Sequence, residues 1–297
     1  MARLYLSGFA DEISPSFSVQ LQALQDLHVS HIELRGIDQT NVSDLSPQQL
    51  REVKAALSAA GIGVSSIGSP IGKIAITDSF APHMEKLKRT LEIQKELGAP
   101  YLRMFSFYLP QDRPAADFRG QVLERLASIA GEAARWDAML LHENEKGIYG
   151  DTAPRCLDLL EHLASPHLRA VFDFANFVEV GQDTLAAYQM LRPFIEYIHI
   201  KDCAVQEGPA GRTTKIVPAG QGEGHIPEIL ISLVTGGWQG FLSLEPHLVD
   251  FAGLAALEQD PAKRDSALDG RTAWELALDT LRAVIGQVSA QTGEVLL

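Results

Sequence analysis

Eight short apolar runs recur along this chain, and longer amphipathic stretches separate most of them. Apolar runs of this length between turn signals are typical of strands that are buried on both faces. The predicted strands are Leu4–Phe9, His31–Leu34, Gly63–Ile67, Tyr101–Phe105, Met139–His142, Leu168–Phe172, Tyr197–Ile200 and Gly240–Leu244. Strands that alternate with helices favour an α/β fold built on a parallel sheet.

The stretches between the strands carry helical periodicity. The predicted helices are Val19–Leu27, Glu52–Ala60, His83–Leu97, Val122–Trp136, Arg155–Leu163 and Pro227–Val234. Ser46, Pro47 and Gln49 form a capping-box pattern with proline at the first helical position. Gly61 and Gly98 follow helix ends, where a left-handed residue is favoured. These start and stop signals support the assignment of helices.

Eight such units predict a closed (β/α)8 TIM barrel. An open doubly wound sheet is the alternative, but it binds its ligand near one switch point, whereas here polar residues end nearly every strand. A length of 297 residues fits one barrel, so we expect a single domain over residues 1–297. Residues 202–225 and 246–271 exceed what a minimal barrel needs. We expect them beside the active-site mouth, either as lids or as plain surface excursions.

Composition limits the classes of function. Apolar residues make up 46 % of the chain and charged residues 21 %, which permits a large core. The formal charge of −13 disfavours nucleic acid and anionic membranes as partners, because both are bound largely through Lys and Arg. The apolar stretch near the N-terminus is short for a signal peptide, and two cysteines cannot build a disulfide framework. We therefore expect a cytoplasmic protein.

Four of the strands end in groups that can bind a metal ion. Glu143, Asp173, His199 and Glu245 close the fifth to eighth predicted strands. An ionised or polar group at a buried strand end is costly unless something compensates it. Neighbouring strands of a barrel direct their ends to one mouth, so these residues can converge on one divalent cation. Three carboxylates with one imidazole suit Mn²⁺ or Mg²⁺, and Zn²⁺ or Co²⁺ less selectively.

Further charged residues follow other strands and are expected around the same mouth. Asp11, Glu12, Arg35, Lys73, Arg103 and Lys201 belong to this group. The cations among them could bind a phosphate or carboxylate of a substrate, since Arg and Lys are the usual partners of such groups. They could equally neutralise Glu33, Glu145 and Asp202. We favour an anion-binding role for at least one of them.

The strand-end motifs resemble those of a known superfamily. They read His-Glu-Asn at 142–144, Phe-Asp-Phe-Ala-Asn at 172–176, His-Ile-Lys-Asp at 199–202 and Leu-Glu-Pro-His at 244–247. In this order they resemble the sugar phosphate isomerase/epimerase superfamily of xylose isomerase-like TIM barrels. In its ketose 3-epimerases Glu, Asp, His and Glu hold the metal, and the two Glu move the proton. The resemblance assigns these roles to Glu143, Asp173, His199 and Glu245.

Two departures narrow the resemblance. Those epimerases usually carry a histidine and an arginine where this chain has Asn176 and Val205, which disfavours a free-ketohexose epimerase. The endonuclease IV branch needs additional histidines for three zinc ions, but this chain has Ser69, Arg103 and Ser106 on the corresponding strands. The acidic charge also disfavours DNA, so that branch is excluded.

The resemblance implies a divalent-metal-dependent isomerase or epimerase that acts on a sugar, sugar phosphate or related hydroxy-carbonyl compound through an enediolate. A dehydratase of a keto-sugar or inosose shares the first step and is the alternative, and a non-catalytic sugar-binding barrel is a weaker one. Relatives are commonly dimers or tetramers, so a homo-oligomer is expected. The predicted substrate-binding residues are Glu33, Arg35, Lys73, Arg103, Asn144, Asn176, Lys201, Asp202 and His247.

Overall fold

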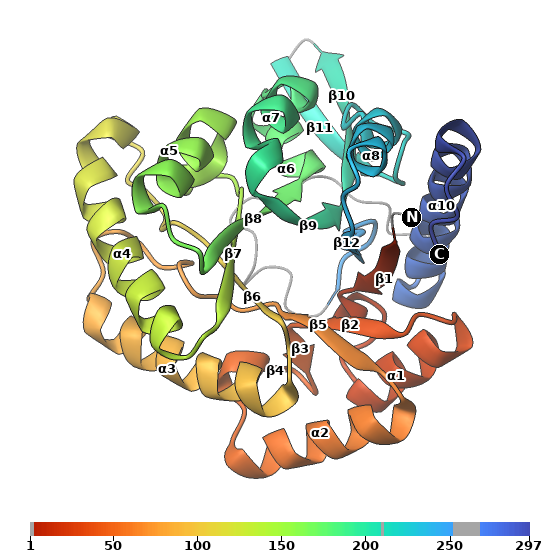
Figure 1. Cartoon of the computed structure of the whole chain (residues 1–297), viewed down its shortest axis with the longest axis horizontal. Coiled ribbons are helices and arrows are strands. Elements are labelled where there is room, and N and C mark those ends of the chain that lie inside the picture. The colour runs from red at the N-terminus through yellow and green to blue at the C-terminus, as the bar shows by residue number, and fades with distance from the viewer. Residues whose placement is uncertain (1–2, 209–210, 252–267) are drawn as a thin grey trace.

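Eight parallel strands form the central sheet of the computed structural model, which describes residues 3–208, 211–251 and 268–297. Their order is β1-β12-β9-β8-β7-β6-β5-β2, so barrel strands that are consecutive along the sequence are also neighbours in the sheet. The strands are β1 Leu4–Gly8, β2 His31–Leu34, β5 Gly63–Ile67, β6 Tyr101–Met104, β7 Met139–Glu143, β8 Leu168–Asp173, β9 Ile195–Ile200 and β12 Gly240–Leu244. The end strands β1 and β2 also contact each other, and the predicted TIM barrel is confirmed as a nearly closed one (Figure 1).

Helices surround this barrel on its outside (Figure 1). They are α1 Phe17–Asp26, α2 Pro47–Ala60, α3 Phe80–Leu97, α4 Arg119–Arg135, α5 Ala153–Leu163, α6 Phe174–Glu179, α7 Thr184–Leu191, α8 Ile226–Thr235 and α10 Gly270–Thr292. Short 3₁₀ turns lie at η1 Ala10–Glu12, η2 Val42–Asp44, η3 Ala115–Phe118, η4 Tyr149–Asp151 and η5 Arg192–Phe194. No helix of these segments combines the length and apolar run that crossing a bilayer requires.

The predicted capping signals are confirmed. Ser46 Oγ accepts a hydrogen bond from the Gln49 backbone N–H, and Gln49 Oε1 accepts one from the Ser46 N–H, which begins α2 at Pro47. Gly61 and Gly98 end α2 and α3 at φ of 66° and 67°, which a residue without Cβ adopts at little cost. Several helices begin two to five residues before their predicted starts, since apolar periodicity marks the interior of a helix better than its ends.

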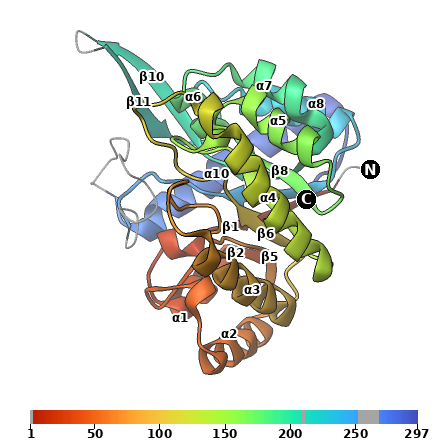
Figure 2. The same cartoon turned by 90° about the vertical axis from the view of Figure 1, so that its left-hand side faces the viewer.

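Residues 202–225 were expected to be an excursion at the mouth. They form an antiparallel ribbon, β10 Asp202–Gly208 with β11 Gly211–Val217, followed by a glycine-rich loop that leads into α8. The ribbon extends away from the barrel (Figure 2). A second, smaller ribbon pairs β3 Gly36–Ile37 with β4 Thr40–Asn41. Most of the segment 246–271 lies outside the described residues.

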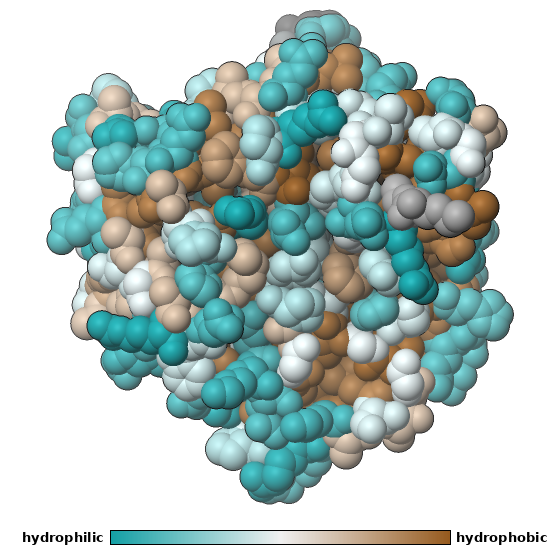
Figure 3. Space-filling model, in the orientation of Figure 1, coloured by the Kyte–Doolittle hydropathy of each residue, from teal (hydrophilic) through white to brown (hydrophobic). Residues whose placement is uncertain are grey.

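The core lies between the barrel and its helices. Phe172, Ile198 and Leu242 are fully buried there, and Trp274 of α10 covers the glycine at the end of β1. Hydrophilic side chains cover the outward helix surfaces, and hydrophobic ones appear in the grooves between them (Figure 3). Burial of this apolar surface holds the strands in one register. The strand ends therefore have fixed positions at the mouth.

Candidate metal centre

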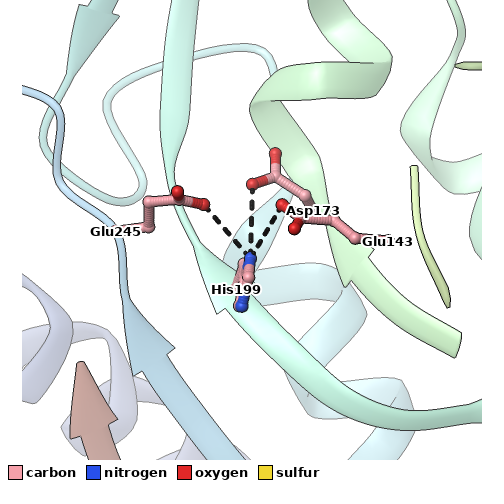
Figure 4. A group of neighbouring side chains, drawn as sticks. All are labelled: Glu143, Asp173, His199 and Glu245. Carbon is pink, nitrogen blue, oxygen red and sulfur yellow. Dashed lines mark hydrogen bonds and ion pairs between the residues drawn. The ribbon is translucent and has the colours of Figure 1, made fainter. Parts of the chain in front are cut away.

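The four predicted metal ligands lie together at the ends of four neighbouring strands. Glu143 and Asp173 are the last residues of β7 and β8, His199 lies one residue before the end of β9, and Glu245 directly follows β12. His199 Nδ1 is 3.0 Å from Glu143 Oε1, 3.1 Å from Glu245 Oε2 and 4.0 Å from Asp173 Oδ2. The two glutamates approach the imidazole from opposite sides (Figure 4). All four side chains are buried.

This arrangement fits a divalent cation. One oxygen each of Glu143, Asp173 and Glu245 is buried and makes no hydrogen bond of good geometry among the described residues. The nitrogen atoms that lie near these oxygens belong to Arg103, Lys201 and His199, at 3.1, 3.3 and 3.1 Å. Each ligand residue offers one atom, and these atoms lie within 4.8 Å of one another. Three buried carboxylates that converge in this way repel one another unless a positive charge lies between them. The donor set therefore matches what a metal ion with oxygen and nitrogen ligands requires.

Burial opposes ionisation of all three carboxyls, and neighbouring charges decide the outcome at each of them. Burial raises the pKa of Asp173 to about 7, with Glu245 and Glu143 adding to the rise and Lys201 opposing it. Burial also opposes ionisation of Glu143, but His199 and Arg103 hold the pKa of that carboxyl at about 2. The pKa of Glu245 lies well below its usual value because Lys201 and His247 outweigh the effect of burial. Both glutamates are thus ionised near neutral pH.

Glu33 contacts His199, the predicted histidine ligand, at the ring nitrogen that faces away from Glu143. Glu33 Oε2 is 3.0 Å from His199 Nε2 and accepts a hydrogen bond of 2.7 Å from Ser243 Oγ. An Nε2–H that donates to a carboxylate leaves the Nδ1 lone pair directed at the cluster of Glu143, Asp173 and Glu245. Glu33 was predicted to bind substrate, and its hydrogen bonds among the described residues are with His199 and Ser243.

Replacing Glu33 with Gln is expected to weaken Mn²⁺ binding by about 10–100-fold, the usual effect of losing such a partner. The amide keeps the shape but can present N–H to His199 and removes the charge that favours the Nδ1-ligating tautomer. Calorimetric titration of the metal-free protein measures the affinity. Glu196→Gln is the matched control. Glu196 lies on β9, the strand that carries His199, and accepts a hydrogen bond from Tyr101 away from the centre. Equal affinities in both variants would contradict the assigned role.

The four predicted cations of the mouth all contact carboxylates. Arg103 Nη1 is 3.1 Å from Glu143 Oε2, Lys201 Nζ is 3.3 Å from Asp173 Oδ2, and Lys73 Nζ is 2.9 Å from Glu145 Oε2. Arg35 binds both oxygens of Asp11 at 2.9 and 3.0 Å and reaches Glu12 at 3.3 Å and Glu245 at 3.2 Å. Each of these cations therefore neutralises at least one neighbouring carboxylate.

Asn144 and Asn176 hold Asp173 in place at the end of β8. The Asn144 amide donates to the Asp173 carbonyl at 3.0 Å, and its Oδ1 accepts from the Asp173 N–H at 3.0 Å. The Asn176 N–H donates to Asp173 Oδ1 at 2.8 Å, and its amide donates to the Asn144 carbonyl at 2.8 Å. These two predicted substrate-binding residues thus position Asp173, one of the four predicted metal ligands.

Asp202 organises the glycine-rich loop that follows β11. Its carboxylate accepts hydrogen bonds from the backbone N–H groups of Gly220, Gly222 and Gly224, at 2.9–3.0 Å, and from that of Cys203 at 2.9 Å. A Cβ on Gly222 would lie 2.4 Å from Asp202 Oδ1, so only glycine permits this close approach. The loop joins β11 to α8, and Asp202 fixes its path.

His247 lies between Glu12 and Glu245 and contacts both carboxylates. Its backbone N–H donates to Glu12 Oε2 at 2.8 Å, and its Nε2 is 3.4 Å from both Glu12 Oε1 and Glu245 Oε1. Asp11 and Glu12 were expected around the mouth, and they contact Arg35 and His247 there, whereas Ser243, which contacts Glu33, was not predicted. Asp11 and Glu12 come shortly after a predicted strand, which is the signal that pointed to the four candidate ligands; Ser243 lies inside a strand and carries no comparable signal.

Comparison with known proteins places this arrangement in a family. A family model described as xylose isomerase-like TIM barrel matches residues 21–282, and the chain belongs to this family. The chain is 25 % identical over 172 residues to the 3-dehydroshikimate dehydratase of Bacillus anthracis, a match that covers 53 % of this chain and 60 % of that relative.

Solved structures share the fold over nearly the whole chain. The structure of an L-ribulose 3-epimerase superimposes with a TM-score of 0.76 at 19 % identity and covers 99 % of this chain and 97 % of that one. A xylose isomerase-like TIM barrel protein from Mycobacterium smegmatis in complex with magnesium gives a TM-score of 0.69 at 17 % identity, over 96 % and 98 % of the two chains. At these identities the likeness concerns the fold.

Proposed function

We propose that this protein is a divalent-metal-dependent isomerase or epimerase of a sugar or related hydroxy-carbonyl compound. The observation that carries the proposal is the placement of two ionised glutamates, Glu143 and Glu245, on opposite sides of His199 within one cluster of ligand atoms. A binding protein needs a cation site but has no use for a base on each face of its ligand. Proton transfer at a carbon atom makes use of both.

The residues present favour Mn²⁺ or Mg²⁺ over Zn²⁺ or Co²⁺, because three of the four donors are carboxylate oxygens. The magnesium complex of a structural neighbour is consistent with this choice. When bound, the cation supplies positive charge that stabilises the enediolate formed from a hydroxy-carbonyl substrate. Glu143, Asp173, His199 and Glu245 would hold it.

The chain's own residues move the proton. One glutamate removes the proton from the carbon next to the carbonyl, and the other glutamate returns a proton to the opposite face, which gives the epimer. Return at the neighbouring carbon interconverts aldose and ketose. Arg103 lies beside Glu143 with a buried Nε–H that has no partner among the described residues, and it can stabilise negative charge on a substrate oxygen.

A dehydratase is the second candidate, and the match to a 3-dehydroshikimate dehydratase favours it. The first proton removal is the same. The hydroxyl on the next carbon then leaves with a proton, for which Lys201 and His247 lie near Glu245, at 3.7 and 3.4 Å. The product distinguishes the two reactions, because elimination yields water and a conjugated carbonyl that absorbs ultraviolet light.

A panel of sugars, sugar phosphates and keto-sugar acids in D₂O tests the proposal. We expect the Mn²⁺-loaded protein to place solvent deuterium on the carbon next to the carbonyl of at least one compound, as measured by NMR and mass spectrometry. Because Lys73, Arg103 and Lys201 already contact carboxylates, we expect Lys73→Ala to change the KM of a neutral substrate by less than about twofold. If no compound of the panel takes up deuterium although the metal is bound, the proposed activity is refuted.

A further inference from the structure

A cavity of about 620 Å³ lies beside the metal centre on the side of β6, β7 and β8. Residues from the segments after these three strands line it, with Tyr108, Ile148 and Val180 among its apolar members. Its volume falls within the range of about 300–1,000 Å³ that is common for small-molecule sites. The four metal-ligand residues do not line it, so the proposed proton transfer leaves this space unused.

Two lining residues connect the cavity to the centre. Asn176 lines it, and the Asn176 N–H donates to Asp173 Oδ1 at 2.8 Å. Glu145 lines it two residues after the ligand Glu143, and its carboxylate pairs with Lys73. The cavity and the ligands thus share the C-terminal side of neighbouring strands. A substrate whose reacting carbon lies at the centre can reach the cavity only if a second chemical group is joined to its reacting ring.

Backbone hydrogen bonds hold one wall of the cavity in place. The Tyr108 N–H donates to the Ile74 carbonyl at 3.0 Å, and the Tyr108 carbonyl accepts from the Ile76 N–H at 2.9 Å. The Leu109 N–H donates to the Gly147 carbonyl at 3.1 Å, which ties the segments after β6 and β7 together. Phe107 is buried at a φ of +67°, a strained conformation for a bulky side chain that the surrounding structure imposes. The wall is therefore formed before any ligand arrives.

The charged side chains that line the cavity are balanced in sign, with Arg113, Lys146 and Arg155 against Glu145, Asp151 and Glu179. Arg113 pairs with Asp117 at 3.1 Å, Arg155 pairs with Asp151, and Glu145 pairs with Lys73 at 2.9 Å. An anionic group would have to compete with these carboxylates for each arginine. A neutral ring with hydroxyl groups has no such competition, since its apolar face can pack on Tyr108 and its hydroxyls can bond the charged pairs at the rim.

We propose that this cavity is a second subsite that binds an uncharged sugar ring or aglycone joined to the reacting ring, so that the substrate is a glycoside rather than a free sugar or sugar phosphate. The inference rests on the proposed function, because it takes the reacting ring to lie at the metal centre. Remote binding of this kind increases turnover of the complete substrate beyond that of its truncated form.

The test compares a keto-sugar, its glycoside with a second hexose, and its phosphate ester in the D₂O exchange assay with Mn²⁺-loaded protein. We expect kcat/KM for the glycoside to exceed that of the free sugar by about tenfold or more. Ala115→Trp, which places a large ring in the cavity, should reduce the difference to less than about twofold and leave the free sugar unaffected. Ala59→Trp is the matched control, because Ala59 lines a separate groove between α1 and α2.

Equal turnover of glycoside and free sugar, preference for the phosphate ester, or equal effects of Ala115→Trp on all three compounds would overturn the subsite. If none of them exchanges deuterium, the proposed function fails on its own. The subsite is then decided by calorimetry of the same metal-loaded protein with an unreactive disaccharide. Binding that Ala115→Trp abolishes and Ala59→Trp preserves supports it, and absence of binding to the wild-type protein refutes it.

Discussion

Replacing Glu245 with Gln is expected to slow exchange of the substrate's α-hydrogen with D₂O by about 10²–10⁴-fold, the usual contribution of a positioned general base. The amide keeps the side-chain shape and one oxygen that can bind the cation, but it removes the basicity. Lys201 and His247 hold the pKa of Glu245 well below its usual value against the effect of burial, so the wild-type carboxylate is ready as a base near neutral pH. Exchange is followed by NMR at saturating Mn²⁺ with the bound metal quantified.

Glu143→Gln should have an effect of similar size. If the two glutamates act on opposite faces, each variant abolishes exchange from one epimer while exchange from the other persists, and assays begun from each epimer resolve this. Glu196→Gln, on β9 but away from the centre, controls for a general effect of a lost carboxylate. Near-normal turnover in both site variants with metal bound would move the base elsewhere, with His247, Glu145 and Lys201 as the next candidates.

Replacing His199 with Ala is expected to reduce bound Mn²⁺ from about one ion per chain to nearly none after dialysis. The change removes the nitrogen ligand and leaves the buried carboxylate of Glu33 without its partner Nε2. Metal analysis by mass spectrometry measures the occupancy. A second readout is thermal unfolding, since a ligand at about 100 times its Kd stabilises the folded state by about 2.7 kcal/mol. Chelation should therefore lower the Tm of the wild-type protein and leave that of the variant unchanged.

His199→Gln provides a variant that can fold if the alanine variant does not, because it fills most of the same space and retains groups for Glu33. It should show the same loss of the chelator-dependent Tm shift, to a smaller extent if its amide oxygen binds the ion weakly. Unchanged metal content in folded His199→Ala would refute the four-residue centre. Undiminished metal-dependent stabilisation in both variants would do the same.

The ends of the strands were predictable because the signal is local. Glu143, Asp173 and Glu245 each follow a buried apolar run, and such a run reveals its own boundaries through hydropathy. The short helices α6 and α7 and the long helix α10 were not predicted, and the β10–β11 ribbon was expected only as an excursion. Short elements contain too few residues for a periodic pattern, and an exposed ribbon has little apolar alternation to detect.

The partners of the polar residues were decided by tertiary structure alone. The sequence placed Glu33 among substrate-binding candidates, but its hydrogen bonds join residues 166 and 210 positions away, His199 and Ser243. In the same way, Asp202 faces backbone N–H groups of a loop and Asn144 faces the main chain of Asp173.

By itself, then, the sequence determined the alternation of strands and helices, and with it the strand ends at which the four ligands lie, because burial of apolar runs depends on neighbouring residues. The pairing of each cation with a carboxylate, the orientation of His199 by Glu33 and the cavity beside the centre came from the tertiary structure. A contact or a void of this kind depends on how far apart in space distant segments lie, and hydropathy along the chain carries no such distances.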